Sequence, residues 1–155
     1  MSNLGNINTG IPNTSCKEVV VYDSENYIGT IDYDNNGFGT FALPPGLMEN
    51  LHSMEIQYGV NNLSFKKVIP VPIENYAQLN DDQSKWNLSG RFDENGKYIN
   101  CTICGFNMMY QNNRLDRITT FYQTGYFPNG SLPEISECDL NNTCIIQKII
   151  LYVND

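Results

Sequence analysis

The sequence predicts an all-β protein, a single-domain Greek-key β-sandwich of mostly antiparallel strands. Within residues 18–59, short runs of alternating apolar and polar residues are separated by the turn-forming tetrapeptides DSEN and DNNG. Asn, Gly, Tyr and Thr are frequent, whereas charged residues make up 17% of the chain. This composition favours turns and strands over helices. A chain of 155 residues is long enough to bury a core in one domain.

The first strands are the most clearly marked. VVVY (19–22), YIGTIDY (27–33) and FGTFAL (38–43) predict three strands joined by polar turns. PPGLMENL (44–51) contains two prolines that lack an N–H donor, so it predicts an arch with at most one helical turn. SMEIQYG (53–59) predicts the fourth strand.

The middle of the chain is less regular. LSFKKVIPVPI (63–73) predicts one strand that bends or becomes an edge at its prolines. ENYAQLNDDQSKW (74–86) suits either a short helix or a long loop. Residues 86–106 predict a hairpin with its turn at Asn95 and Gly96.

The two ends of the chain complete the prediction. Residues 1–15 are small, polar and aperiodic, and predict a flexible arm before a domain of residues 16–155. Residues 107–117 predict a loop, followed by a strand around 118–122. IIQKIILYV (145–153) is a nearly continuous apolar run, typical of a buried strand, and a helix is the alternative.

An apolar spacing of i, i+3 and i+5 recurs three times along the chain. It predicts a motif repeated at the start of three strands, and chance recurrence in a β-rich chain is the alternative. The three sets are Leu51, Met54 and Ile56; Leu115, Ile118 and Thr120; and Ile146, Ile149 and Leu151.

Two aromatics and a glycine form a recognisable corner in the first segment. The pattern Tyr22, DSEN, Tyr27, Ile, Gly29 resembles the signature of βγ-crystallin Greek keys, and the FALPPG arch is similar to the one in that family. The resemblance implies a folded hairpin with the aromatics packed over its turn. It implies a second key around residues 121–153, with residues 60–117 containing an insertion or a degenerate key.

The same resemblance implies a calcium site. Many members of the family bind calcium through two adjacent Asn or Asp residues followed by hydroxyl residues, and such oxygen ligands suit a hard cation. The first candidate loop, residues 48–53, is broken at Met48 and His52. The second contains Asn112 and Asn113, with Asp116 in place of a hydroxyl.

A second set of possible calcium ligands follows another pattern. Asp32, Asp34 and Asn36, followed by Gly37, match positions one, three, five and six of an EF-hand loop. Leu43 stands where the bidentate Glu is required. A turn with solvated carboxylates is the alternative interpretation.

Five cysteines offer different chemistry. Cys101 and Cys104 have the spacing of a zinc knuckle, and Cys138 with Cys144 could complete a tetrahedral site. A Cys138–Cys144 disulfide or unreactive thiols are the alternatives. The two oxygen-rich motifs make calcium the predicted cofactor, and the cysteines make zinc the second choice.

The charge balance excludes several partners. The formal net charge of −8 disfavours binding to nucleic acid or to an anionic membrane. The N-terminus shows no signal peptide and no apolar run could span a bilayer, so we expect a soluble protein, with the cytoplasm as the favoured compartment.

No catalytic constellation stands out, and His52 is the only histidine. The leading hypothesis is a non-enzymatic, βγ-crystallin-like structural or binding module. It would be stabilised by calcium and would pack with a protein partner or with copies of itself. The alternative is a recognition domain for a carbohydrate or a protein, with Trp86, Tyr122 and Tyr126 as candidate binding residues.

Overall fold

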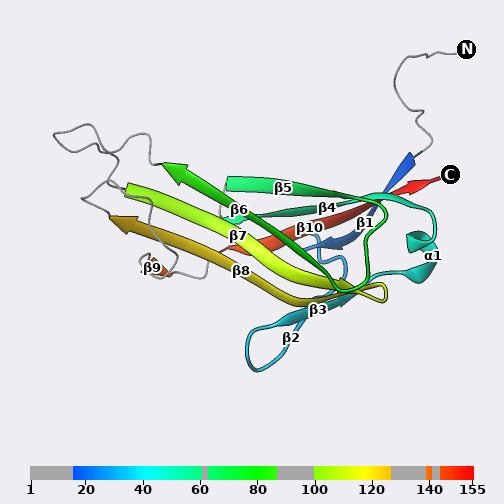
Figure 1. Ribbon diagram of the computed structural model, residues 1–155, viewed down its shortest axis with the longest axis horizontal. Coiled ribbons are helices and arrows are strands. Elements are labelled where there is room, and N and C mark those ends of the chain that lie inside the picture. The colour runs from blue at the N-terminus through cyan, green and yellow to red at the C-terminus, as the bar shows by residue number, and fades with distance from the viewer. Residues whose placement is uncertain (1–15, 61–62, 87–99, 127–138, 141–143) are drawn as a thin grey trace, which may run out of the picture.

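The described residues form two antiparallel β-sheets packed face to face (Figure 1). The computed structural model describes residues 16–60, 63–86, 100–126, 139–140 and 144–155. The first sheet has the order β1-β10-β4-β5; the second has the order β2-β3-β8-β7-β6, with β9 paired to β8. The prediction of an all-β sandwich is confirmed, whereas the Greek-key connection remains a prediction.

The elements have the following bounds: β1 Cys16–Asp23, β2 Asp32–Tyr33, β3 Gly39–Ala42, α1 Pro45–Met48, β4 Leu51–Val60, β5 Leu63–Pro70, β6 Ala77–Trp86, β7 Asn100–Gln111, β8 Arg114–Tyr126, β9 Asp139–Leu140 and β10 Ile145–Asn154. The one-turn helix α1 follows Pro44, where the chain passes from β3 in one sheet to β4 in the other (Figure 1). In the described part of the chain, no helix is long and apolar enough to cross a membrane.

A tight turn closes the end of β1. Asp23 is 4% exposed, and its Oδ1 accepts hydrogen bonds from the backbone N–H groups of Glu25 (3.0 Å) and Asn26 (3.1 Å). Its Oδ2 accepts a bond of 2.9 Å from Asn26 Nδ2 and lies 3.7 Å from Lys148 Nζ. These bonds, led by the one from the Asn26 side chain, lower the pKa of Asp23. The backbone groups of Asp23 and Ile28 then pair across the turn.

The aromatic corner is built around Gly29. Gly29 has a φ of +71°, and a Cβ on it would lie 2.5 Å from the carbonyl oxygen of Val21. The Tyr22 ring packs edge-on against Phe41 with centroids 5.8 Å apart. Tyr27, however, is 92% exposed at a φ of 58°. The expectation that both tyrosines pack over the turn is therefore wrong for Tyr27, whose ring lies in solvent, while Tyr22 packs against Phe41 of β3.

Two segments in the middle differ from their predictions. Residues 77–86, expected as a helix or loop, form the edge strand β6, whose exposed side tolerates polar residues. Residues 107–111, expected as a loop, continue β7 up to a two-residue turn. In that turn Asn112 and Asn113 have φ values of 49° and 58°, as a type I′ hairpin requires.

The repeated i, i+3, i+5 spacing marks three β-bulges. In β10, Ile146 and Lys148 pair with the consecutive residues Tyr58 and Gln57, so Gln147 is an extra residue. His52 is the extra residue in β4, and β8 has one between Asp116 and Thr119. A bulge adds one residue to the two-residue period of a strand. The first and second apolar residues of each set therefore face the same side.

The core lies between the two sheets. The first sheet contributes Tyr58 and the second contributes Phe106, both with 0% exposure, and their rings meet edge-on with centroids 5.0 Å apart. The Tyr58 hydroxyl donates a 2.5 Å hydrogen bond to Asp81 Oδ2 on β6. Other fully buried side chains are Met54, Ile56, Met108, Leu115, Ile118, Ile146, Ile149 and Leu151. Residues 60–117, expected to contain an insertion or a degenerate key, supply strands β5, β6 and β7 of the two sheets.

Candidate functional site

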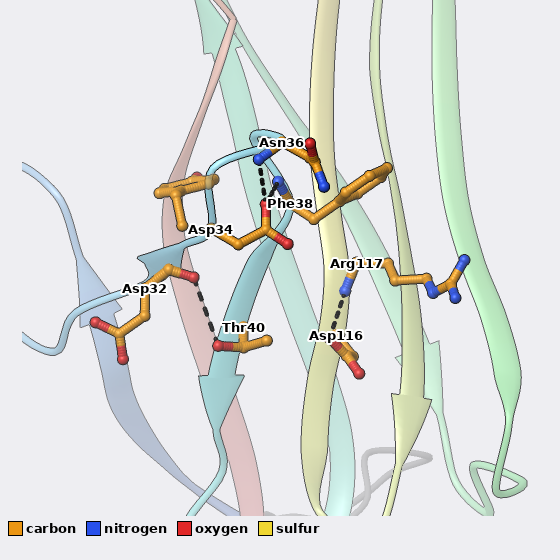
Figure 2. A pocket seen from close by; sticks show the side chains of 8 residues that line it. Asp32, Asp34, Asn36, Phe38, Thr40, Asp116 and Arg117 are labelled. Atoms are coloured by element: carbon orange, nitrogen blue, oxygen red, sulfur yellow. Dashed lines mark hydrogen bonds between the residues drawn. The ribbon is translucent and has the colours of Figure 1, made fainter.

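A pocket of about 500 Å³ opens beside the β2–β3 loop. One side comes from that loop and the other from the bulge of β8, which pairs with β3 (Figure 2). The lining side chains combine two aromatic rings with carboxylate, amide, hydroxyl and guanidinium groups. They are Asp32, Tyr33, Asp34, Asn36, Phe38, Thr40, Asp116 and Arg117.

Asp34 holds the β2–β3 loop closed. Its Oδ1 accepts hydrogen bonds from the backbone N–H groups of Asn36 (2.8 Å) and Phe38 (2.9 Å). The backbone N–H of Asp34 donates to the Phe38 carbonyl at 2.9 Å, and Gly37 supplies the left-handed conformation with a φ of +83°. These hydrogen bonds hold the backbone of Asn36 and Phe38 in one conformation beside the pocket.

The opposite side of the pocket depends on the β8 bulge. Arg117 has a φ of 52°, and its backbone N–H donates to Asp116 Oδ1 at 2.9 Å. Asp116 Oδ2 accepts from Gln111 Nε2 at 3.1 Å and lies 3.3 Å from Arg114 Nη2. The bulge thus places the Asp116 carboxylate next to the β2–β3 loop, whereas the Arg117 side chain extends away from that loop (Figure 2).

The two aromatic rings of the pocket keep much of their surface in solvent. Tyr33 is 56% exposed and Phe38 is 40% exposed. Partial burial, with a smaller effect of the nearby Tyr22, raises the pKa of Tyr33 above its usual value. The Tyr33 hydroxyl therefore remains protonated near neutral pH and can donate a hydrogen bond to a ligand.

The pocket brings together residues from both predicted calcium sites. Asp32, Asp34 and Asn36 lie on one side, and Asp116 lies on the other. The Asp32 carboxylate points away from Asp34 and Asp116 (Figure 2). Within the described residues, no three acidic, histidine or cysteine side chains are grouped to hold a metal ion.

Asn112 and Asn113 serve the β7–β8 turn and do not line the pocket. The backbone N–H of Asn112 donates to Asn75 Oδ1 at 3.1 Å. The Asn113 side-chain oxygen Oδ1 accepts a 3.0 Å hydrogen bond from the Tyr110 hydroxyl, and the Asn113 backbone carbonyl accepts a 2.9 Å hydrogen bond from the N–H of Leu43. Of the three predicted ligands in the crystallin-type loop, only Asp116 therefore lines the pocket.

The predicted zinc knuckle is not formed. Cys101 and Cys104 both belong to the continuous strand β7, which has no turn between them. The tight turn that a zinc knuckle requires is therefore absent between these two positions. Cys104 is 1% exposed and lies instead beside Cys144, which is 2% exposed. Cys138 lies outside the described residues, and Cys144 carries a thiol.

The aromatic residues predicted to bind a ligand lie away from this pocket. Tyr122 is partly buried and packs against the core. Trp86 pairs with Cys101 at the end of β6, and Tyr126 pairs with Asn100 at the end of β8. Their strand positions are described, but their side chains lie outside the described part.

Sequence reasoning missed Tyr33, Phe38, Thr40 and Arg117 as lining residues. The available signal was the pair of aromatics that flank the DNNG turn, which were interpreted as ordinary strand residues. His52 is exposed, and its Nδ1 lies 3.1 Å from Ser53 Oγ, but neither residue lines the pocket.

Comparison of the chain with protein-family models, with curated proteins and with solved structures gave no match. The geometry of the pocket is therefore the basis on which a function can be inferred.

Proposed function

We propose that the protein is a non-enzymatic recognition module that binds a carbohydrate in the pocket between the β2–β3 loop and the β8 bulge. The observation that supports this most is the combination of exposed Tyr33 and Phe38 rings with Asn36, Asp116 and Arg117 around one opening. A sugar has apolar C–H faces and a rim of hydroxyl groups. Such a ligand is held by aromatic surfaces together with a few fixed polar groups.

The size and rigidity of the pocket support the same proposal. A volume of about 500 Å³ lies within the usual range for small-ligand pockets. The Asp34 hydrogen bonds fix the loop before a ligand binds. Pre-organisation of this kind lowers the entropic cost of binding.

The polar groups offer both kinds of hydrogen bond. The Asn36 amide can donate and accept, the Asp116 carboxylate accepts, and the Thr40 and Tyr33 hydroxyl groups do both. A neutral sugar presents donors and acceptors together, and this mixed set matches it better than it matches a purely anionic ligand.

The proposal is tested with a glycan array probed with the labelled full-length chain. We expect retention of at least one class of glycan by the wild-type chain and loss of it in the Phe38→Ala variant. The retained glycan is then titrated by calorimetry, and removal of the ring should weaken its affinity about tenfold or more, the equivalent of ~1.4 kcal/mol.

Tyr76→Ala is the matched control, because Tyr76 is 68% exposed and does not line the pocket. It should bind the array like the wild type. An array that retains no wild-type chain, or one on which Tyr76→Ala loses binding and Phe38→Ala keeps it, would overturn the proposal.

Calcium is a second candidate ligand for the same pocket. The specific observation in its favour is that Asp34 and Asp116, which come from two separately predicted calcium motifs, line one opening. A bound calcium ion would suit the βγ-crystallin-like, calcium-stabilised structural module that packs with a protein partner or with itself. In that role Asp32 would have to turn its carboxylate towards the pocket.

Scanning calorimetry with and without millimolar calcium tests this second candidate. Calcium binding to the folded state alone would raise the melting temperature. Asp34→Asn combined with Asp116→Asn should remove that rise, and magnesium at the same concentration is the control cation. An unchanged melting temperature would exclude calcium stabilisation.

A further inference from the structure

Cys104 and Cys144 are two buried thiols that the fold brings together from distant parts of the chain. Cys104 lies on β7 in the second sheet, and Cys144 immediately precedes β10 in the first sheet. They are 1% and 2% exposed and belong to the same core. The Cys144 thiol donates to the carbonyl oxygen of Gly105, the residue after Cys104, with a separation of 3.7 Å.

Backbone contacts fix the position of Cys144. Its carbonyl oxygen accepts a 2.7 Å hydrogen bond from the Thr120 hydroxyl on β8. The hydrogen bond from the Cys104 side chain lowers the pKa of the Cys144 thiol, although its burial acts in the opposite direction. Ionisation of the Cys144 thiol to the thiolate thus costs less free energy than it does for an ordinary buried cysteine.

We infer that Cys104 and Cys144 form a disulfide that links the two sheets when the protein meets an oxidising thiol–disulfide environment. In the reaction both thiols lose a proton, and together they lose two electrons to a low-molecular-weight disulfide such as oxidised glutathione. The bond between the two protein sulfur atoms forms, and the reagent's S–S bond breaks to release two of its thiols. This modification site is independent of the carbohydrate pocket.

Such a bond would connect residues that are distant in sequence, so it would restrict the unfolded chain strongly. Because both thiols are buried, the reagent reaches them in the native protein only when the structure opens locally. Oxidation during refolding avoids this barrier, and it is therefore the direct test.

The experiment uses a full-length Cys16→Ser, Cys101→Ser, Cys138→Ser variant, in which Cys104 and Cys144 are the remaining cysteines. The variant is refolded with oxidised glutathione, remaining thiols are alkylated, and the digest is analysed by mass spectrometry. We expect a linked Cys104–Cys144 peptide and a melting temperature about 10 °C above that of the reduced variant. The same variant with Cys144→Ala is the matched control and should show no such rise.

Wild-type protein is mapped in parallel, so that the test does not depend on the folding of the variant. A Cys104–Cys144 peptide from the wild-type chain supports the inference. Alkylation of both cysteines after oxidative refolding, or a wild-type map in which Cys144 is linked to Cys138, would overturn it.

Discussion

Gly29 occupies a position in which a side chain would meet the backbone. Its φ is +71°, and an added Cβ would lie 2.5 Å from the Val21 carbonyl oxygen and 3.2 Å from the Phe41 ring. Gly37 has a similar φ of +83°, but a Cβ there would meet nothing within 4 Å. A comparison of alanine substitutions at the two glycines therefore distinguishes the free-energy cost of the left-handed backbone from the cost of a steric clash.

We predict that Gly29→Ala lowers the free energy of unfolding by about 2–4 kcal/mol, since the clash adds to the left-handed conformational cost. Gly37→Ala should lose only ~1 kcal/mol, for the conformational cost alone. Chemical denaturation of both variants gives the comparison. Equal losses would show that the close approach at Gly29 does not constrain the fold.

The Asp23 carboxylate makes stability depend on acid pH. Its pKa is lowered in the folded protein, chiefly by the Asn26 side chain. A carboxyl group with a lowered folded pKa stabilises the fold above its unfolded pKa of about 3.9, and that stabilisation is lost as the pH falls through the folded value. Protonation of Asp23 in acid should therefore lower the free energy of unfolding.

We predict that the melting temperature of the wild type falls below about pH 4 more steeply than that of Asp23→Asn, which has no proton to gain at this site. Asp23→Asn should melt at a lower temperature than the wild type near pH 7. Melting curves measured between these pH values test the prediction, and parallel pH profiles for the two proteins would contradict it.

At the scale of the element, the bulges explain why three strands break the two-residue period. Leu115 and Ile118 are both fully buried although they are three residues apart, because β8 contains one extra residue between them. The same extra residue places Asp116 and Arg117 at the pocket. The bulge in β8 therefore affects both the packing of the core and the position of residues that line the pocket.

Deletion of Arg117 should remove this bulge and leave Leu115 and Ile118 two positions apart, so that both still face the core. We predict that the free energy of unfolding changes by about 1 kcal/mol or less, because no core residue is turned to solvent and a left-handed residue is removed. Arg117→Gly keeps the extra residue and suits the φ of 52°, so its stability should equal or exceed that of the wild type. A deletion that lowers the free energy of unfolding by about 3 kcal/mol or more, as loss of a buried side chain would, would contradict the role of Arg117 as the extra residue.

The strands that the sequence predicts well are those whose pattern is local. The β10 run and the β1 to β4 segment have apolar spacing that fits their burial, and the i, i+3, i+5 spacing identifies the bulges once the sheet register is known. β6 was missed because its polar residues, including Asp82, face solvent on an edge strand, where alternation is weak. The Asn112–Asn113 turn was missed although two adjacent asparagines suit a type I′ turn.

At the scale of the whole molecule, both proposed sites depend on contacts between distant segments. The pocket joins the β2–β3 loop to β8, and the thiol pair joins Cys104 to Cys144. Sequence spacing instead grouped Cys101 with Cys104 and Asn112 with Asn113. Spacing along the chain identifies ligands within one loop, but the pairing of sheets decides which loops meet.

The pocket also shows why acidic motifs alone were insufficient. Asp34 and Asp116 were identified from the sequence, yet their oxygen atoms accept hydrogen bonds from nearby backbone and side-chain groups. The aromatic partners Tyr33 and Phe38 gain meaning only when the loop folds and leaves their rings exposed. The proposal of a sugar ligand therefore depends on these two exposed rings, which the acidic motifs do not identify.

The most direct test of the central claim is amide NMR of the full-length chain during titration with the glycan most strongly retained on the array. The account predicts the largest shifts in residues 32–40 and 114–118, on the two sides of the pocket, with saturation that the Phe38→Ala variant weakens. Largest shifts elsewhere in the chain, with residues 32–40 unchanged, or no shifts at all, would contradict it.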